Sequence, residues 1–155
     1  MPRKRSLSVE LPSVNPRCAA GEIDMPISKV LMAEDDLDIQ KVIRMSLKFS
    51  GVDEVVAVGD GDECLAAVNR VQPDLVLLDV TMPRLDGYET CRRLKANPDT
   101  RSIPVIFLTA SAQKSEEEVG FAAGAAGYLT KPFDPITLLE QILAILEREK
   151  LSTNP

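Results

Sequence analysis

Acidic residues end two short apolar segments of this sequence, and acids placed in this way can bind a cation. Glu34 and Asp35 follow the first segment, and Asp79 follows the segment Leu75-Val76-Leu77-Leu78. Carboxylates that lie close together repel each other unless a cation lies among them. Magnesium takes oxygen ligands, commonly one or two carboxylates with waters and phosphate oxygens, and a backbone carbonyl just after Asp79 offers another. We expect a magnesium site here, although the acids could instead only cap the turns and helix that follow.

Two further residue types would complete a site for a phosphoryl group. A carboxylate such as Asp79 can act as a nucleophile toward phosphorus and form an aspartyl phosphate. Such transfer depends mainly on positioning and on neutralisation of charge. Lys131 supplies a cation and Thr109 a hydroxyl donor, each at the end of a later apolar segment. Either residue alone is typical of an ordinary protein surface, but together with Asp79 they predict phosphoryl binding.

The elements that must position these residues alternate five times between strand and helix. Apolar segments that do not alternate with polar residues are typical of strands buried on both faces of a parallel sheet. The predicted strands are 30–33, 55–58, 75–79, 105–108 and 127–129. Predicted helices follow each strand: Gly51 ends the first, 88–96 is the third, a Ser115–Glu118 capping box opens the fourth, and Asp134-Pro135 opens the fifth. The pattern predicts an α/β fold, a doubly wound five-stranded parallel sheet with five helices, whose carboxyl edge binds ligands.

The 155 residues predict one folded domain with a short tail at each end. Residues 1–26 contain four prolines and no apolar periodicity, so we expect a disordered N-terminal tail. Residues 27–150 form the predicted domain and residues 151–155 a C-terminal tail. Met25 would be a natural start of the domain, in which case residues 1–24 are an extension or a wrongly assigned start.

Charge, cysteines and hydropathy exclude several classes of partner and location. The net charge of the chain is −6. Residues 1–17 carry a net charge of +3, so the remaining residues carry a net charge of −9. An acidic domain argues against nucleic acid as the main partner. The three cysteines are far apart and no histidine accompanies them, so we expect neither a disulfide nor a zinc site and infer a reducing cytoplasm. No apolar stretch approaches membrane-spanning length, and the basic start lacks the apolar segment of a signal peptide, so we expect neither.

Taken together, the motifs resemble the receiver domain of bacterial two-component response regulators, in its stand-alone form like the chemotaxis receiver. The matching segments are Glu34-Asp35, the D-x-x-M-P-x-x-D-G motif that begins at Asp79, Thr109-Ala110 and Tyr128-Leu129-Thr130-Lys131-Pro132-Phe133. The resemblance covers about residues 28–148. It implies a flavodoxin-like sheet with strand order 2-1-3-4-5, an order that the chemotaxis receiver itself exemplifies.

The resemblance also implies roles for the site residues. Asp79 would accept a phosphoryl group from the histidine of a sensor kinase, and Lys131 would contact that group. The implied protein ligands of Mg²⁺ are Glu34, Asp35, Asp79 and the carbonyl of Thr81. The protein would then be no enzyme beyond its own phosphorylation and dephosphorylation.

A conformational switch is implied as well. Thr109 would move toward the phosphoryl group and Tyr128 would turn inward, and the Lys131–Pro132 bond would be cis. The fourth helix, fifth strand and fifth helix would change shape and bind a partner, or a second copy in a weak dimer. Leu138 and Ile145 lie on a second apolar stripe of the last helix, which we expect to remain exposed for this contact.

Several alternatives remain at this point. Because the sequence ends soon after the last predicted helix, we expect action through another protein, either a downstream target or a histidine phosphotransfer protein in a phosphorelay. An aspartyl-nucleophile phosphatase would use Asp79 and Mg²⁺ too, but needs a second Asp where this chain has Thr81. A flavodoxin-like flavin carrier needs a hydroxyl-rich loop after the first strand, where this chain has three acids.

Overall fold

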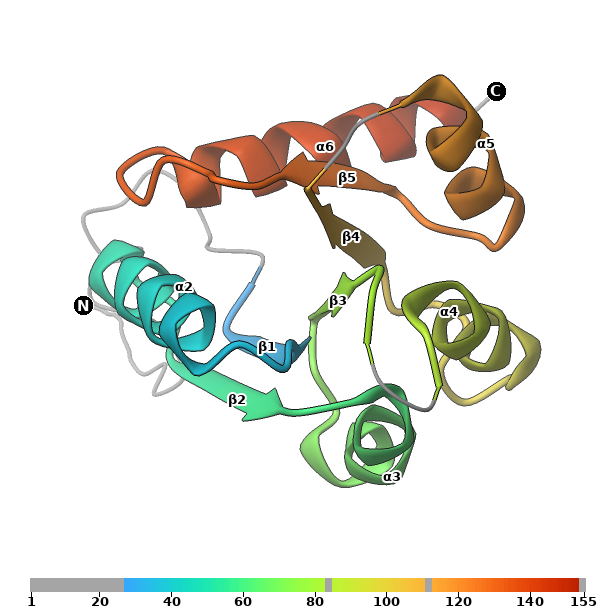
Figure 1. Ribbon diagram of the computed structural model, residues 1–155, viewed down its shortest axis with the longest axis horizontal. Coiled ribbons are helices and arrows are strands. Elements are labelled where there is room, and N and C mark those ends of the chain that lie inside the picture. Colours follow the sequence, from blue (N-terminus) through green and yellow to red (C-terminus); the bar gives the residue numbers. More distant parts are fainter. Residues whose placement is uncertain (1–26, 83–84, 111–112, 154–155) are drawn as a thin grey trace, which may run out of the picture.

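The protein folds as a five-stranded parallel sheet between two layers of helices (Figure 1). The computed structural model describes residues 27–82, 85–110 and 113–153. The strands are β1 (Lys29–Ala33), β2 (Glu54–Val58), β3 (Leu75–Asp79), β4 (Val105–Thr109) and β5 (Gly127–Thr130). Their order is β2-β1-β3-β4-β5, so the predicted α/β fold and the implied order 2-1-3-4-5 are confirmed.

Five helices connect and flank these strands. They are α2 (Leu37–Ser50), α3 (Gly61–Val71), α4 (Gly87–Ala96), α5 (Lys114–Ala122) and α6 (Leu138–Thr153). Asp36, Asp60 and Asp86 cap α2, α3 and α4, each accepting backbone N–H groups of the first turn. Gly51 ends α2 with a φ of 116°, in the left-handed region that favours glycine. Helices α2 and α6 cover one face of the sheet, and α3, α4 and α5 cover the other (Figure 1).

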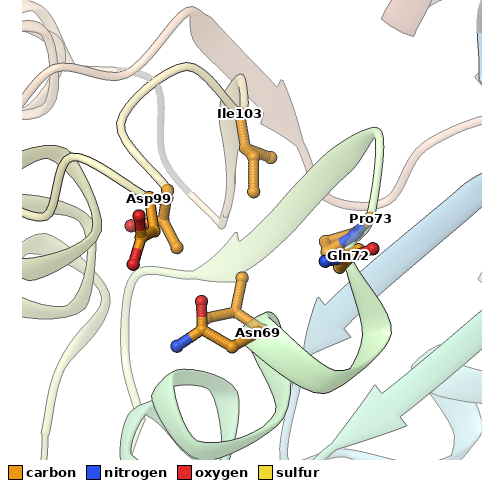
Figure 2. A pocket seen from close by; sticks show the side chains of 7 residues that line it. Asn69, Gln72, Pro73, Asp99 and Ile103 are labelled. Carbon is orange, nitrogen blue, oxygen red and sulfur yellow. The ribbon is translucent and has the colours of Figure 1, made fainter.

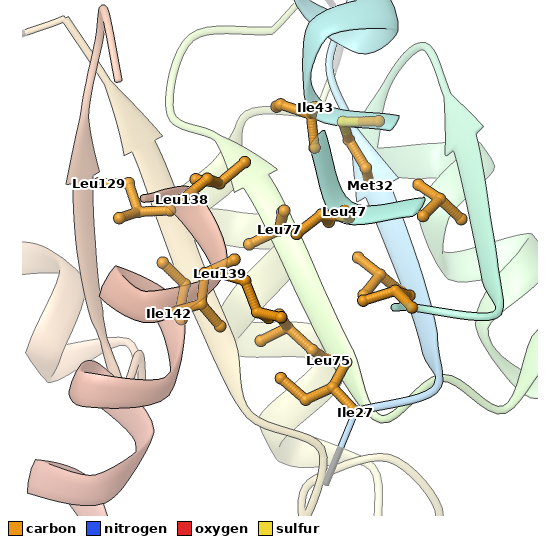
Figure 3. Close-up of a cluster of buried hydrophobic side chains, with 14 of the residues drawn as sticks. Ile27, Met32, Ile43, Leu47, Leu75, Leu77, Leu129, Leu138, Leu139 and Ile142 are labelled. Atoms are coloured by element: carbon orange, nitrogen blue, oxygen red, sulfur yellow. The ribbon is translucent and has the colours of Figure 1, made fainter. Parts of the chain in front are cut away.

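The two faces of the sheet carry separate apolar clusters that fix the strands in register. On the α2 and α6 side, Ile43 and Leu47 pack toward Met32 and Leu77, as Figure 3 shows. Leu139 and Ile142 of α6 complete this cluster. Burial of each such side chain contributes about 1.5–3 kcal/mol. Because β3 and β4 are buried along their whole length, the polar residues at their carboxyl ends are held at one rigid edge.

Two predicted helix starts are wrong. Helix α5 begins at Lys114 after Gln113, whose side chain makes no capping hydrogen bond, so Ser115 lies inside the first turn and is not the cap. Helix α6 begins at Leu138 rather than after Pro135. The Asp134 carboxylate accepts the N–H of Ile136 at 2.9 Å and thereby closes a separate turn before the helix. The same capping motif can begin a helix or close an isolated turn, and tertiary packing decides which of these two structures forms.

The expected exposed stripe on the last helix is also wrong. Leu138 and Ile145 are 0% and 5% exposed, because α6 packs against both α2 and β5 and therefore buries a wide arc of its surface. The large apolar side chains that are exposed lie instead on α2, on α5 and in the turn before α6: Leu37, Val42, Met45, Phe49, Val119, Phe121 and Ile136. Helical spacing would place Val42 on the same buried face of α2 as Ile43 and Leu47, yet the Val42 side chain faces outward.

The ends of the chain are described only in part. Residues 1–26 lie outside the described residues, so their disorder stays a prediction. Helix α6 runs to Thr153 and so includes the first residues of the expected C-terminal tail. Among the helices that the structure describes, none is both long and apolar enough to span a bilayer.

Candidate functional site

The three predicted acids lie together at the carboxyl edge of the sheet. Strands β1 and β3 are neighbours, with Ala33 paired to Leu78, so the residues that follow them meet. One carboxylate oxygen each from Glu34, Asp35 and Asp79 lies within 4.8 Å of the others. Glu34 and Asp79 are 1% and 6% exposed, whereas Asp35 faces solvent. The arrangement is a carboxylate cluster with one open side.

Lys131 joins this cluster from the far side of β4. Its Nζ lies 2.9 Å from Oε1 of Glu34 and 3.4 Å from Oδ1 of Asp79. Its backbone N–H donates to the carbonyl of Thr109 at 2.7 Å, which holds the residue against the end of β4. Burial lowers the pKa of Lys131, but the Glu34 hydrogen bond and the Asp79 charge outweigh this effect and raise the pKa above its ordinary value. Lys131 therefore stays charged beside the two carboxylates.

The electrostatics of Glu34 show that the cluster lacks compensating positive charge. Burial, with a smaller contribution from the Asp79 charge, raises the pKa of Glu34 from 4.5 to about 7, despite the Lys131 hydrogen bond. The N–H of Asp36 donates to Oε2 of Glu34 at 3.1 Å, and one ammonium serves both buried acids. A hard divalent cation prefers an all-oxygen set of this kind. The residues present therefore fit Mg²⁺, with Glu34, Asp35 and Asp79 as the side chains that would hold it.

The loop after β3 shapes the rest of the site. The N–H of Thr81 donates to Oδ1 of Asp79 at 3.2 Å, so the backbone at Thr81 lies beside the carboxylate. Gly87 opens α4 directly against the Asp79 carbonyl and the Val80 Cα, where a Cβ atom would overlap backbone. The glycine of the motif thus has a steric reason, since only glycine lets α4 approach the end of β3 this closely.

Thr109 and Tyr128 form a second part of the site on β4 and β5. Thr109 ends β4, is buried, and is paired with Thr130 of β5. The Tyr128 ring lies 5.5 Å from the ring of Phe107 and 5.8 Å from that of Phe121. Its hydroxyl donates to the carbonyl of Glu116 in α5. Burial and the neighbouring Tyr88 raise the pKa of Tyr128, so this hydroxyl remains a donor.

Tyr88 is a residue that the sequence analysis did not single out. Its hydroxyl reaches the same Glu116 carbonyl at 3.4 Å, and its ring packs edge-on against Phe107 at 5.1 Å. Its position in the first turn of α4, directly after Gly87, is the only sequence signal that points to it. The Lys131–Pro132 peptide bond is cis, as the resemblance implies.

Another hollow lies away from these residues. It is lined by Asn69, Gln72 and Pro73 at the end of α3 and by Asp99 and Ile103 in the loop before β4 (Figure 2). Pro73 and Ile103 precede β3 and β4, so the hollow is at the amino edge of the sheet, opposite Asp79. It takes no part in the site.

Comparisons with known proteins identify relatives of this chain. The family model of the response regulator receiver domain matches residues 30–143. The response regulator MprA of Mycobacterium leprae is 43% identical over 122 residues, which are 79% of this chain and 52% of that protein. The DNA-binding dual master transcriptional regulator RpaA of Synechocystis is 39% identical over 77% of this chain and 49% of its own length. The chain therefore spans about half the length of these curated relatives.

Solved structures match over nearly their full length. A putative response regulator from Chloroflexus aurantiacus has a TM-score of 0.72 at 35% identity, covering 78% of this chain and 98% of that one. The chemotaxis response regulator CheY4 of Vibrio cholerae has a TM-score of 0.72 at 31% identity, with coverage of 77% and 98%. The chain belongs to the response regulator receiver domain family of two-component systems.

Proposed function

We propose that this receiver domain accepts a phosphoryl group on Asp79 from a phosphohistidine of a sensor kinase and signals through protein contacts that depend on phosphorylation. The observation that carries the proposal is the position of Lys131, whose Nζ lies 2.9 Å from Glu34 and 3.4 Å from Asp79. A cation that lies beside two buried acids, one of them the nucleophile, suits an incoming phosphoryl group, whose oxygens it would contact.

The transfer follows from the chemistry of these residues. A carboxylate oxygen of Asp79 attacks phosphorus in line with the departing imidazole, the P–N bond breaks, and the histidine nitrogen keeps the electron pair. Lys131 neutralises phosphoryl oxygens on one side, and Thr109 offers its hydroxyl on the other. Mg²⁺ held by Glu34, Asp35 and Asp79, with the Thr81 carbonyl as a further ligand, would supply the remaining positive charge. The protein acts in its own modification rather than as a catalyst of an external substrate.

The output is proposed to be a protein contact. RpaA is described as DNA-binding, but this chain spans only about half of that protein. The residues described here carry a net acidic charge, and they form one receiver domain. A phosphorelay in which Asp79 passes its phosphoryl group to a histidine phosphotransfer protein uses the same site, and incubation with such proteins distinguishes the two roles.

The test is phosphorylation by a small P–N donor. Incubation of the full chain with phosphoramidate and Mg²⁺, followed by intact mass measurement, should add one phosphoryl group. Chelation of Mg²⁺ or the Asp79→Asn substitution should abolish the addition, whereas Asp62→Asn on the exposed first turn of α3 should not. Equal phosphorylation of Asp79→Asn and the parent chain would show that the nucleophile is wrong.

A further inference from the structure

An apolar stripe on the outer surface of α2 has no partner among the described residues. Val42, Met45 and Phe49 recur at helical spacing and point outward, with Met45 71% and Phe49 91% exposed. Ile136, in the turn before α6, is 86% exposed beside them. Together with Ser46, Lys48, Ser50 and Pro135 these four residues line one groove, which we name the α2 groove. A contiguous apolar surface of this kind usually marks a contact.

The groove is rigid because α2 is tied to the turn on its other side. The hydroxyl of Ser46 donates to the carbonyl of Pro135, and Ile43 and Leu47 anchor the opposite face of the helix in the core. The groove therefore exists before anything binds to it. A preformed surface lowers the conformational cost of binding, because only the partner has to become ordered.

The N-terminal segment joins the domain beside one end of this groove. Ile27 is buried in the same apolar cluster as Leu47 and Val52. The carbonyl of Ser28 accepts the N–H of Glu54 at 2.9 Å, only a few residues after α2 ends at Ser50. Ile27, the first described residue, therefore lies near the carboxyl-terminal end of α2, where Phe49 lies.

The length of the segment matches the groove. Residues 15–26 reach up to about 40 Å when extended, which is more than enough to enter it. Residues 7–14 would extend about 26 Å, and a helix of 14 residues such as α2 is about 21 Å long. In an extended chain Leu7, Val9 and Leu11 point to one side, since successive side chains alternate.

The charges also complement each other in this direction. A segment that enters at the Phe49 end and runs toward the start of α2 carries Arg3-Lys4-Arg5 to the amino-terminal end of the helix. Asp35, Asp36 and Asp38 are exposed there, whereas the exposed basic residues of α2, which are Lys41, Arg44 and Lys48, lie further along the helix. Basic residues near an acidic helix start gain favourable, salt-sensitive electrostatic energy.

We propose that residues 3–14 dock in the α2 groove of the same chain, with Leu7, Val9 and Leu11 against Val42, Met45 and Phe49. The basic cluster then lies beside the acids at the start of α2, at the open rim of the carboxylate site. The sequence by itself offered no surface for this segment to pack on, and the exposed stripe of α2 supplies one.

A nitroxide placed in the segment tests the proposal in the full chain. The Ser6→Cys, Cys18→Ser variant leaves one reactive thiol, because Cys64 and Cys91 are fully buried. With a nitroxide on that thiol, the amide signals of residues 37–49 should lose most of their intensity, while those of α3 and α4 keep theirs. Adding Leu7→Ser, Val9→Ser and Leu11→Ser should restore the α2 signals.

Two controls decide among the possible occupants of the groove. Phe49→Ser should also restore the α2 signals, whereas Val119→Ser, which changes an exposed apolar residue of α5, should not. In a mixture of isotope-labelled chain without nitroxide and unlabelled chain with it, the α2 signals should stay intact. Loss of signal in that mixture would show that a second copy occupies the groove. Weak loss spread over the whole domain would show that the segment does not dock; either result overturns the proposal.

Discussion

The ring of Tyr128 fills the space that a side chain on Gly120 would need. A Cβ atom built on Gly120 overlaps the Tyr128 hydroxyl and would lie 2.6 Å from its Cζ. A glycine inside a helix weakens it, so Gly120 makes α5 easier to shift. The structure gives it a second role, since its missing side chain lets the Tyr128 hydroxyl reach the Glu116 carbonyl.

Gly120→Ala should therefore displace the Tyr128 ring and lower the free energy of unfolding by about 1–3 kcal/mol through overpacking. In a Tyr128→Ala background the same change meets no ring and should instead stabilise α5 by up to about 1 kcal/mol. Urea unfolding of the two single variants and the double variant gives the coupling between the residues. Equal effects of Gly120→Ala in both backgrounds would show that the two residues do not compete for space.

Thr109→Ala should separate phosphorylation from the response to it. The hydroxyl is not the nucleophile, so the variant should still accept a phosphoryl group on Asp79. It should lose most of the change that beryllium fluoride, a phosphoryl mimic, causes in the amide signals of residues 116–130. The matched control is Thr130→Ala, an exposed threonine paired with Thr109 on β5, which should respond like the parent. A full response in Thr109→Ala would place the coupling route elsewhere.

The sheet and the meeting of the acids follow from the sequence because both depend on strong, local patterns. Uninterrupted apolar runs end directly at Glu34, Asp79 and Thr109, and parallel strands must bring such ends to one edge. The exposure of Val42 and the burial of Ile145 could not be predicted in this way. Helical periodicity shows that a face is apolar, but the neighbours of α2 and α6 decide how wide an arc is buried.

Magnesium should reverse a loss of stability that Glu34 causes as the pH rises. Its pKa is 4.5 in the unfolded chain and raised by burial to about 7 in the folded one, so the folded state binds this proton more tightly. Without Mg²⁺, this residue should make the free energy of unfolding fall between pH 4.5 and 7, and Mg²⁺ should restore it at neutral pH. Glu34→Gln should remove both effects in urea titrations. Unchanged pH and Mg²⁺ responses in this variant would contradict the assignment.

The thiols should differ sharply in reactivity. Burial raises the pKa of Cys64 to about 12 and that of Cys91 to about 11, so both remain protonated and shielded at neutral pH. Iodoacetamide should modify only Cys18 in the folded protein and all three thiols in urea, as counted by mass spectrometry. Rapid modification of Cys64 or Cys91 without urea would show that the layer of α3 and α4 opens readily.

Identification of the phosphorylated residue tests the central claim most directly. After incubation with phosphoramidate and Mg²⁺, borohydride reduction converts an aspartyl phosphate to homoserine, which peptide mass mapping locates. The expected result is conversion at Asp79 alone, lost when Mg²⁺ is chelated and strongly reduced in Lys131→Ala, which lacks the ammonium beside Asp79. Conversion at Asp35 or another acid, with Asp79 intact, would contradict the account.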